Sequence, residues 1–132
     1  LQGKAPAAAA LATLLDAYGQ VLWANEPGIL ADLDPEFLHD YRVALRSLRS
    51  WVGDLRKVLG KSARTRVKAE LATLNRVTGH VRDLDVLQAE LPGYLAALGG
   101  VDVTQAARLD ALVGQARDEA RHALIAHLRG GA

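Results

Sequence analysis

The sequence predicts an all-α protein, an antiparallel four-helix bundle folded as a single domain over residues 1–132. Half of the residues are apolar and only 5% are aromatic, a mixture that favours helices packed closely through small side chains. The apolar residues recur three and four positions apart, without the alternation that a half-buried strand requires. A chain of 132 residues supports one hydrophobic core but not two.

The first helix is expected over about residues 7–24. Leu14, Tyr18 and Leu22 share one helical stripe because they are spaced four apart. The sequence Asn25-Glu26-Pro27-Gly28 then predicts a stop, since proline cannot donate a helical hydrogen bond and disfavours helical geometry in the residue before it.

The second helix is expected over about residues 35–59 and carries the clearest signals. Asp34 is predicted to cap it, Pro35 suits the first helical position, and Gly60 ends it. Its apolar residues are spaced alternately three and four apart, so they form one row that faces the core. This row consists of Leu38, Tyr41, Leu45, Leu48, Val52, Leu55 and Leu59.

The third helix is expected over about residues 62–91, with Ser62 as its cap and Pro92-Gly93 as its stop. Because only Gly60-Lys61 connects it to the second helix, the two helices are expected to form an antiparallel hairpin. Its core-facing residues are predicted to be Val67, Leu71, Leu74, Val77, Val81 and Leu84.

The fourth helix is expected over about residues 104–129. It follows a loop at residues 99–102, and Gly130-Gly131 is its predicted terminator. Its inward face is predicted to consist of Leu109, Leu112, Val113, Ala116, Ala120 and Ala123.

The net charge of +1 conceals a strong segregation of charge along the chain. Between Arg42 and Arg82 there are 11 Lys and Arg residues against two acids, Asp54 and Glu70, whereas the rest of the chain holds 5 basic and 13 acidic residues. A basic segment of this kind concentrates polyanions, while the acidic remainder keeps the protein in solution.

The second and third helices each carry a row of cationic residues. Both rows are spaced by threes and fours, so in an antiparallel hairpin they line one groove. Arginines stacked in this way repel one another by roughly a few tenths of a kcal/mol per pair, and an anion is therefore expected along them. The rows consist of His39, Arg42, Arg46, Arg49 and Arg56 on the second helix and Lys61, Arg64, Lys68 and Arg82 on the third.

Cationic rows can also be solvated helix faces without a ligand. Three features favour a ligand here: acids that would pair within each helix are nearly absent, the bias recurs on the next helix, and the second helix uses arginine where lysine would serve solubility equally well. The arginine fork makes bidentate contacts with phosphate oxygens. For His39 two roles stay open, a donor to the same anion or a capped, partly buried ring.

Neither catalysis nor a metal site is predicted, and no cofactor is expected. The sequence has no P-loop, no G-x-S-x-G motif, no cysteine nucleophile and no acidic cluster suited to magnesium. His122 and His127 stand five apart on different helix faces, and His80 with Asp83 lacks further ligands. Asp83 or Asp85 is expected to accept from an arginine of the second helix and orient it. The prediction is thus a binding module that needs no divalent metal, and not an enzyme.

Two motifs resemble those of the CHAD domain, the conserved histidine α-helical domain. The run from His39 to Arg49, His-Asp-Tyr-Arg-Val-Ala-Leu-Arg-Ser-Leu-Arg, is similar to the family's His-x-x-Arg-Val-x-x-Arg-Arg-Leu-Arg. The run from Gly79 to Val86, Gly-His-Val-Arg-Asp-Leu-Asp-Val, is similar to its Gly-x-x-Arg-Asp-x-Asp-Val. The resemblance covers roughly residues 11–91 well and the fourth helix loosely. Because the family domain is generally a pair of related helical halves, this chain resembles the N-terminal half.

The resemblance implies a helical module that binds inorganic polyphosphate through a basic surface and locates to polyphosphate granules, in some proteins joined to a triphosphatase-type CYTH domain. Ser47 stands where the family usually has a second arginine, which removes one donor. Half of a two-half fold leaves apolar surface uncovered, so we expect a homodimer. The ligand residues carried over by position are His39, Arg42, Arg46, Arg49, Lys68 and Arg82.

Two other functions are considered, an accessory module that holds the substrate of a phosphohydrolase or triphosphatase, and a nucleic-acid-binding helical domain. Nucleic acid is disfavoured because Tyr41 and Trp51 are the only aromatic neighbours of the basic rows, which leaves little surface for stacking bases. The absence of cysteine fits a reducing compartment, and no segment approaches about 20 uninterrupted apolar residues. We therefore expect a cytoplasmic protein, located on polyphosphate granules and without a membrane partner.

Overall fold

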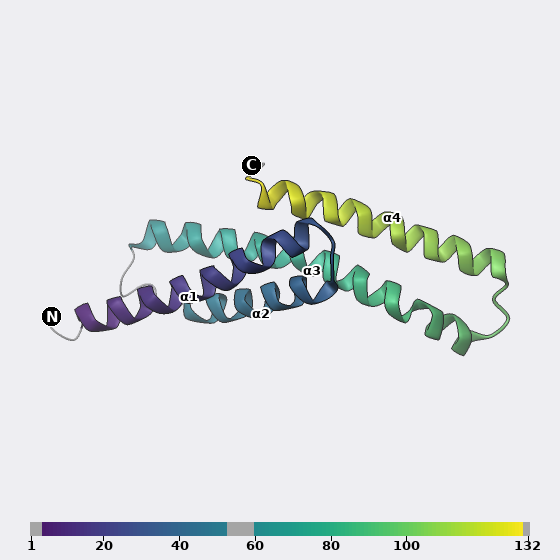
Figure 1. Ribbon diagram of the computed structural model, residues 1–132, viewed down its shortest axis with the longest axis horizontal. Helices are drawn as coiled ribbons and strands as arrows, with labels where there is room; N and C mark the ends of the chain where they lie inside the picture. The colour runs from purple at the N-terminus through teal and green to yellow at the C-terminus, as the bar shows by residue number, and fades with distance from the viewer. Residues whose placement is uncertain (1–3, 53–59, 131–132) are drawn as a thin grey trace. The chain divides into compact units, whose positions relative to one another are not determined.

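The structure, a computed structural model, describes residues 4–52 and 60–130 and contains four helices and no strand within these ranges (Figure 1). The predicted all-α fold is confirmed. No helix in the described ranges is long and apolar enough to cross a membrane. The helices are α1 (Lys4–Leu30), α2 (Pro35–Trp51), α3 (Lys61–Leu98) and α4 (Val103–Leu128).

The chain divides into two compact units, residues 1–76 and residues 77–132, and the division falls within α3. The first unit contains α1, α2 and the beginning of α3. The second contains the rest of α3 and all of α4. That the whole chain acts as a single domain stays a prediction.

Helix α2 supplies the core of the first unit. The Asp34 side chain accepts a hydrogen bond of 2.9 Å from the backbone N–H of Glu36, and Pro35 occupies the first turn, which confirms the predicted start. In the row predicted to face the core, Leu55 and Leu59 lie outside the described residues, as does the predicted end of the helix. The rest of the row is buried throughout, as predicted: Leu38, Tyr41, Leu45, Leu48 and Val52.

Helix α1 continues through Pro27, where the sequence predicted a stop. That prediction was wrong because a proline inside a helix costs about 3 kcal/mol, a finite penalty that packing can offset. Ile29, beyond the proline, is only 5% exposed, and burial of such a side chain contributes about 1.5–3 kcal/mol. Gly28 lies against the ring of Phe37, so α1 and α2 approach closely here. Asp32, with a φ of 53°, then turns the chain toward α2.

Helix α3 also differs from the prediction at both ends. It begins at Lys61, which places Ser62 inside the helix and not at its cap. It runs through Pro92 and ends before Gly99 and Gly100, whose φ angles are 65° and 68°. Glycine adopts this left-handed geometry without strain, and a left-handed residue is a common helix terminator. The glycine pair therefore ends α3, and the predicted stop at the proline was wrong.

In the second unit, α3 and α4 form an antiparallel hairpin (Figure 1). Nε of Arg117 on α4 donates to the Asp85 carboxylate on α3. Three residues further along α3, the Gln88 side chain approaches Gly114, at 3.8 Å from the position of a Cβ there. Residue numbers thus fall on α4 as they rise on α3. The buried side chains of this unit are Thr78, Val81 and Leu91 on α3 and Ala120 and Leu124 on α4.

Helix α4 begins and ends within one residue of its predicted bounds. Asp102 and Gln105 form a capping box, in which the Asp102 carboxylate accepts from the Gln105 N–H at 2.7 Å and the Gln105 side chain accepts from the Asp102 N–H at 3.3 Å. The predicted inward face is wrong at Leu109 and Leu112, which are 41% and 56% exposed, and at Ala123, which is also exposed. Within its unit α4 packs against α3 alone, so it buries a narrow seam and not a broad face.

Candidate anion-binding site

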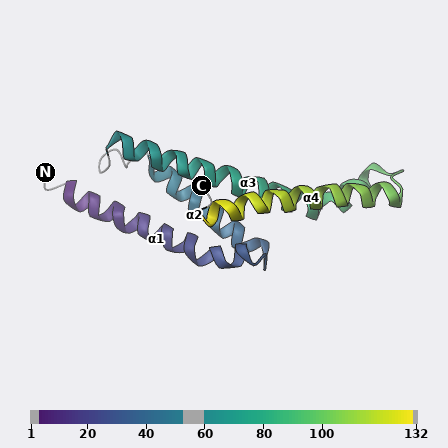
Figure 2. The ribbon, with the colours of Figure 1, turned by 90° about the horizontal axis from the view of Figure 1, so that it is seen from above.

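Helices α2 and α3 lie side by side in the first unit and run in opposite directions (Figure 2). Nη1 of Arg42 on α2 donates a hydrogen bond of 2.9 Å to the backbone carbonyl of Asn75 on α3. Further along α2, Arg49 lines a hollow together with Lys68, which precedes Asn75 on α3. Because residue numbers rise on one helix and fall on the other, the predicted antiparallel orientation is confirmed.

A hollow of about 390 Å³ lies where the end of α2 meets α3. Two of the described residues that line it are cations, Arg49 and Lys68, one from each helix and both exposed at its rim. The others are apolar: Val52, Leu71 and Ala72. Low-dielectric walls reduce solvent screening, so two cations beside them attract an anion more strongly than they would on a fully solvated face.

Arg64 lies one turn before Lys68 on the same face of α3, at a spacing of four residues. Its guanidinium Nε is buried and has no hydrogen-bond partner among the residues that the structure describes. A buried donor without a partner costs about 1–3 kcal/mol. Lys61, exposed in the first turn of α3, precedes Arg64 by three residues and continues the same cationic face. The face combines accessible positive charge with an unsatisfied donor.

The exposed arginines of α2 are Arg46 and Arg49, three residues apart on one face. The hydroxyl between them on the chain, that of Ser47, donates to the backbone carbonyl of Val43 at 3.3 Å. Ser47 stands where the motif usually has a second arginine, and its hydroxyl uses its donor within its own helix. The guanidinium groups of Arg46 and Arg49 supply the cationic character of this end of α2.

Arg42 has a different setting from the arginines that follow it. It is half-buried, and its hydrogen bond to Asn75 connects α2 to α3. Arg42 was predicted as a ligand residue, and the observed contact shows that it also holds the two helices together. Hydrogen bonds from a charged donor contribute about 1.5–3 kcal/mol, so this contact is a substantial part of the α2–α3 interface.

Two predicted ligand residues have no described place in the first unit. Arg56 lies outside the residues that the structure describes. Arg82 belongs to the second unit, where its side chain is partly exposed. Both stay predictions, and the described part of the site is formed by the end of α2 and the beginning of α3.

Asp85 has a partner that the sequence analysis did not identify. It was expected to accept from an arginine of the second helix, but the partner seen in the structure is Arg117 on α4. The two side chains are only 8% and 17% exposed, so the ion pair is largely shielded from solvent. Asp83 is exposed. Arg117 was missed because it lies in the fourth helix, where the family resemblance was loose and no motif marked it.

The buried face of α2 contains one perturbed titratable group, Tyr41. Burial, and to a smaller extent the nearby carboxylates of Glu26 and Glu70, raise its pKa to about 12. The phenol is only 3% exposed and stays neutral at physiological pH. The Glu26 and Glu70 carboxylates therefore place negative charge near the Arg42 end of the cationic row.

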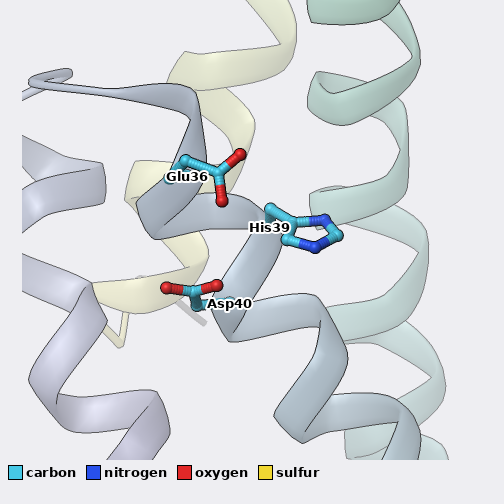
Figure 3. A group of neighbouring side chains, drawn as sticks. All are labelled: Glu36, His39 and Asp40. Atoms are coloured by element: carbon cyan, nitrogen blue, oxygen red, sulfur yellow. The ribbon is translucent and has the colours of Figure 1, made fainter.

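His39 is exposed at the start of α2 beside two acids, Glu36 and Asp40 (Figure 3). Each of the three side chains offers one ligand atom, and these atoms all lie within 4.8 Å of one another. This group was not predicted from the sequence. The signal that would have found it is the spacing of three and four residues, which brings side chains together on one helix face.

The comparisons with known proteins identify one family. Neither the curated proteins nor the solved structures give a significant match. The family model for the CHAD domain matches residues 13–132, which includes both motifs, the hollow and all of α4. The match covers nearly the whole chain, and it extends further than the sequence motifs alone indicated. This chain belongs to the CHAD domain family.

Proposed function

We propose that this chain is a non-catalytic module that binds inorganic polyphosphate in a basic groove between α2 and α3. Membership of the CHAD family supports a role in a polyphosphate or triphosphatase system. The observation that carries the proposal is the hollow in which Arg49 and Lys68, from antiparallel helices, face one space with apolar walls. A linear polyanion can contact both helices at once in such a place.

The groups beside the hollow suit phosphate oxygens chemically. Arginine presents a planar fork that makes paired hydrogen bonds to phosphate, and lysine adds a compact charge. The buried Nε of Arg64 lacks a partner among the described residues and would gain one from a phosphate oxygen. The proposed ligand residues are His39, Arg42, Arg46, Arg49, Arg56, Lys61, Arg64, Lys68 and Arg82, with Asp83 and Asp85 as orienting residues.

The geometry ranks these residues. Arg49 and Lys68 line the hollow and form the centre of the proposed site. Arg46, Arg64 and Lys61 continue the same helix faces at spacings of three and four residues. Arg42 contributes through the α2–α3 interface that it stabilises. The contacts made by Asp85 orient Arg117 within the second unit, so any effect of Asp85 on the ligand acts through that unit's packing.

A salt titration of polyphosphate binding tests this function. Arg49→Ala and Lys68→Ala should each weaken binding and flatten the log–log dependence of affinity on salt by about one unit, because each removes one phosphate contact. Arg66→Ala is the matched control, since Arg66 is an exposed arginine of α3 that does not line the hollow. Equal losses in all three variants would show that binding is diffuse charge attraction and would refute the groove.

Competition separates this function from the two alternatives. Long-chain polyphosphate, ATP and single-stranded DNA should be compared against one labelled polyphosphate at fixed salt. We expect polyphosphate to compete best, because a long polymer spans both helices. Preferential competition by ATP would favour a substrate-holding module of a phosphohydrolase system. Preferential competition by DNA would favour a nucleic-acid-binding domain.

Two further properties, a cellular location and an oligomeric state, are proposed on separate grounds. A polyphosphate-binding chain should collect where the polymer is stored, so we propose a location on polyphosphate granules. We also propose a homodimer, because large apolar side chains such as Tyr94 and Leu98 in α3 are 53% and 74% exposed and such surface favours association. Light scattering across a range of protein concentrations tests the dimer, and a monomer mass throughout would refute it.

A further inference from the structure

The α3–α4 hairpin of the second unit exposes large apolar side chains on both of its helices. On α3, Leu87, Tyr94 and Leu98 are exposed and share one helix face, because they are seven and four residues apart. On α4, Leu109 and Leu112 are exposed and lie three residues apart. Apolar side chains that gather in this way mark a surface that another molecule covers, unlike exposed apolar residues scattered singly.

The two sets lie on the same side of the hairpin. Gln88 of α3 and Arg117 of α4 each lie against the opposite helix and so mark the seam between them. Leu87 precedes Gln88 by one position, and Ala116, which continues the stripe of α4 at a spacing of four, precedes Arg117 by one position. One position is a rotation of about 100° in the same sense on both helices. On antiparallel helices that face each other, the same rotation leads to the same side. The exposed residues therefore form one apolar face, consisting of Leu87, Tyr94, Leu98, Leu109 and Leu112.

Two opposite charges border this apolar face, one on each helix. Glu90 lies three residues after Leu87 and four before Tyr94, and its carboxylate accepts a hydrogen bond of 2.6 Å from the Tyr94 hydroxyl. Arg108 is exposed and directly precedes Leu109 on α4. Within residues 4–52 and 60–130, no hydrogen bond or ion pair is seen for the Arg108 side chain. An acid on one helix and an unpaired base on the other make the face complementary in charge to a copy of itself.

We propose that the apolar face docks the same face of a second copy, so that two hairpins form an antiparallel four-helix bundle. A two-fold axis along the hairpin places α3 of each copy against α4 of the other, and residues at the same height then meet. Asp85 is level with Arg117, so Tyr94, nine residues further along α3, is level with Arg108, nine residues back on α4. Glu90, one turn before Tyr94, therefore comes within reach of Arg108 of the second copy. The inference rests on the homodimer proposed above and assigns its surface, and it does not involve the basic hollow.

Charge reversal tests the pairing, with sedimentation equilibrium over a range of protein concentrations as the measurement. Glu90→Arg and Arg108→Glu should each weaken the dimer at least about tenfold, because each places like charges together at two symmetric contacts. An equimolar mixture of the two variants should dimerise again, since both contacts in the mixed dimer then join opposite charges. Asp118→Arg is the matched control. Asp118 is exposed and follows Arg117 by one position, so it lies on the other side of the hairpin.

Leu112→Glu tests the apolar part of the interface. It should also give a monomer, whereas Trp23→Glu should not, because Trp23 is a large exposed apolar residue of the first unit. Circular dichroism checks that each variant keeps its helicity. A mixture of Glu90→Arg and Arg108→Glu that stays monomeric, or an equal loss in Asp118→Arg, would overturn the proposal. A wild type that is monomeric at every concentration overturns the homodimer as well, whereas a dimer that is insensitive to Glu90→Arg and Leu112→Glu overturns this interface alone.

Discussion

Substitution of Gly28 by alanine should destabilise the first unit, although alanine is the better helix former. Gly28 lies inside α1, and a Cβ there would meet Cγ, Cδ1 and Cδ2 of Phe37 at 2.3, 2.4 and 2.5 Å. An overlap of this size forces either the ring or the helix to move, and such overpacking costs about 1–3 kcal/mol. Alanine gains about 0.5–1 kcal/mol over glycine in a helix. We expect a net loss of about 1–2 kcal/mol.

Gly19→Ala provides the matched control in the same helix, because no atom lies within 4 Å of a Cβ added there. This variant should be stabilised by about 0.5–1 kcal/mol. Urea unfolding followed by circular dichroism measures both variants. In a Phe37→Ala background the Gly28→Ala change should lose its cost, because the overlapping ring is gone. If Gly28→Ala stabilises the protein as much as Gly19→Ala does, the close approach of α1 and α2 is refuted.

Three other predictions test single contacts. Arg42→Met keeps much of the side-chain stem but loses the hydrogen bond to Asn75, so the free energy of unfolding should fall by about 1.5–3 kcal/mol; an unchanged urea midpoint would contradict this. Asp85→Asn leaves Arg117 without its anionic partner, and hydrogen exchange should quicken in residues 77–130 but not around α1. Because the neutral Tyr41 phenol is favoured in the fold, stability should fall as pH rises from about 10 to about 12. A tyrosinate absorbance titration checks this, and Tyr41→Phe should remove the highest-pH transition.

The sequence predicts α2 well because several local signals agree there. The cap at Asp34, the proline after it and a regular apolar row all indicate the same helix, and Leu38 and Leu45 are buried as the row requires. The antiparallel orientation of α2 and α3 also follows from the short connection. These features depend on neighbours in the sequence and on helix geometry, which a sequence displays directly.

The ends of α1 and α3 could not be read from the sequence in the same way. Pro27 and Pro92 are strong local stop signals, yet both lie inside helices. Ile29, which follows Pro27, and Leu91, which precedes Pro92, are both buried. After Pro27 the stop signal is overridden because the following turn packs well, and its packing partner is distant in the sequence. After Pro92 the helix continues with Tyr94 and Leu98 53% and 74% exposed, so packing of the following turn does not explain it.

The candidate site shows the same division. Two cationic rows on an antiparallel hairpin predict that cations from both helices lie beside one groove. Arg49 and Lys68 do line one hollow. The partner of Arg42 is a backbone carbonyl, which every residue has, so no sequence pattern marks it. The partner of Asp85 lies on α4, where no motif indicated a contact. Specific partners of charged side chains therefore require the structure.

The structure also shows that the cationic row of α2 is not uniform along its length. At its beginning, Glu36 and Asp40 lie beside His39. The carboxylates of Glu26 and Glu70 lie near enough to Tyr41 to raise its pKa. These acids offset part of the positive potential that Arg42 provides. Their reach is limited, because charges more than about 8–10 Å apart on the surface are largely screened at physiological ionic strength.

At the other end of the row the balance is different. Arg46 and Arg49 lie one and two turns beyond Arg42 on α2, and Arg49 lines the hollow together with Lys68 of α3. Arg64 adds a buried donor without a partner among the described residues. If the groove binds a polyanion as proposed, the attraction is strongest where α2 ends and α3 begins, and a polyanion that extends toward the start of α2 approaches carboxylates. In the proposed groove, these acids would repel an anion at the start of α2, whereas Arg46 and Arg49 would attract it toward the other end of the helix.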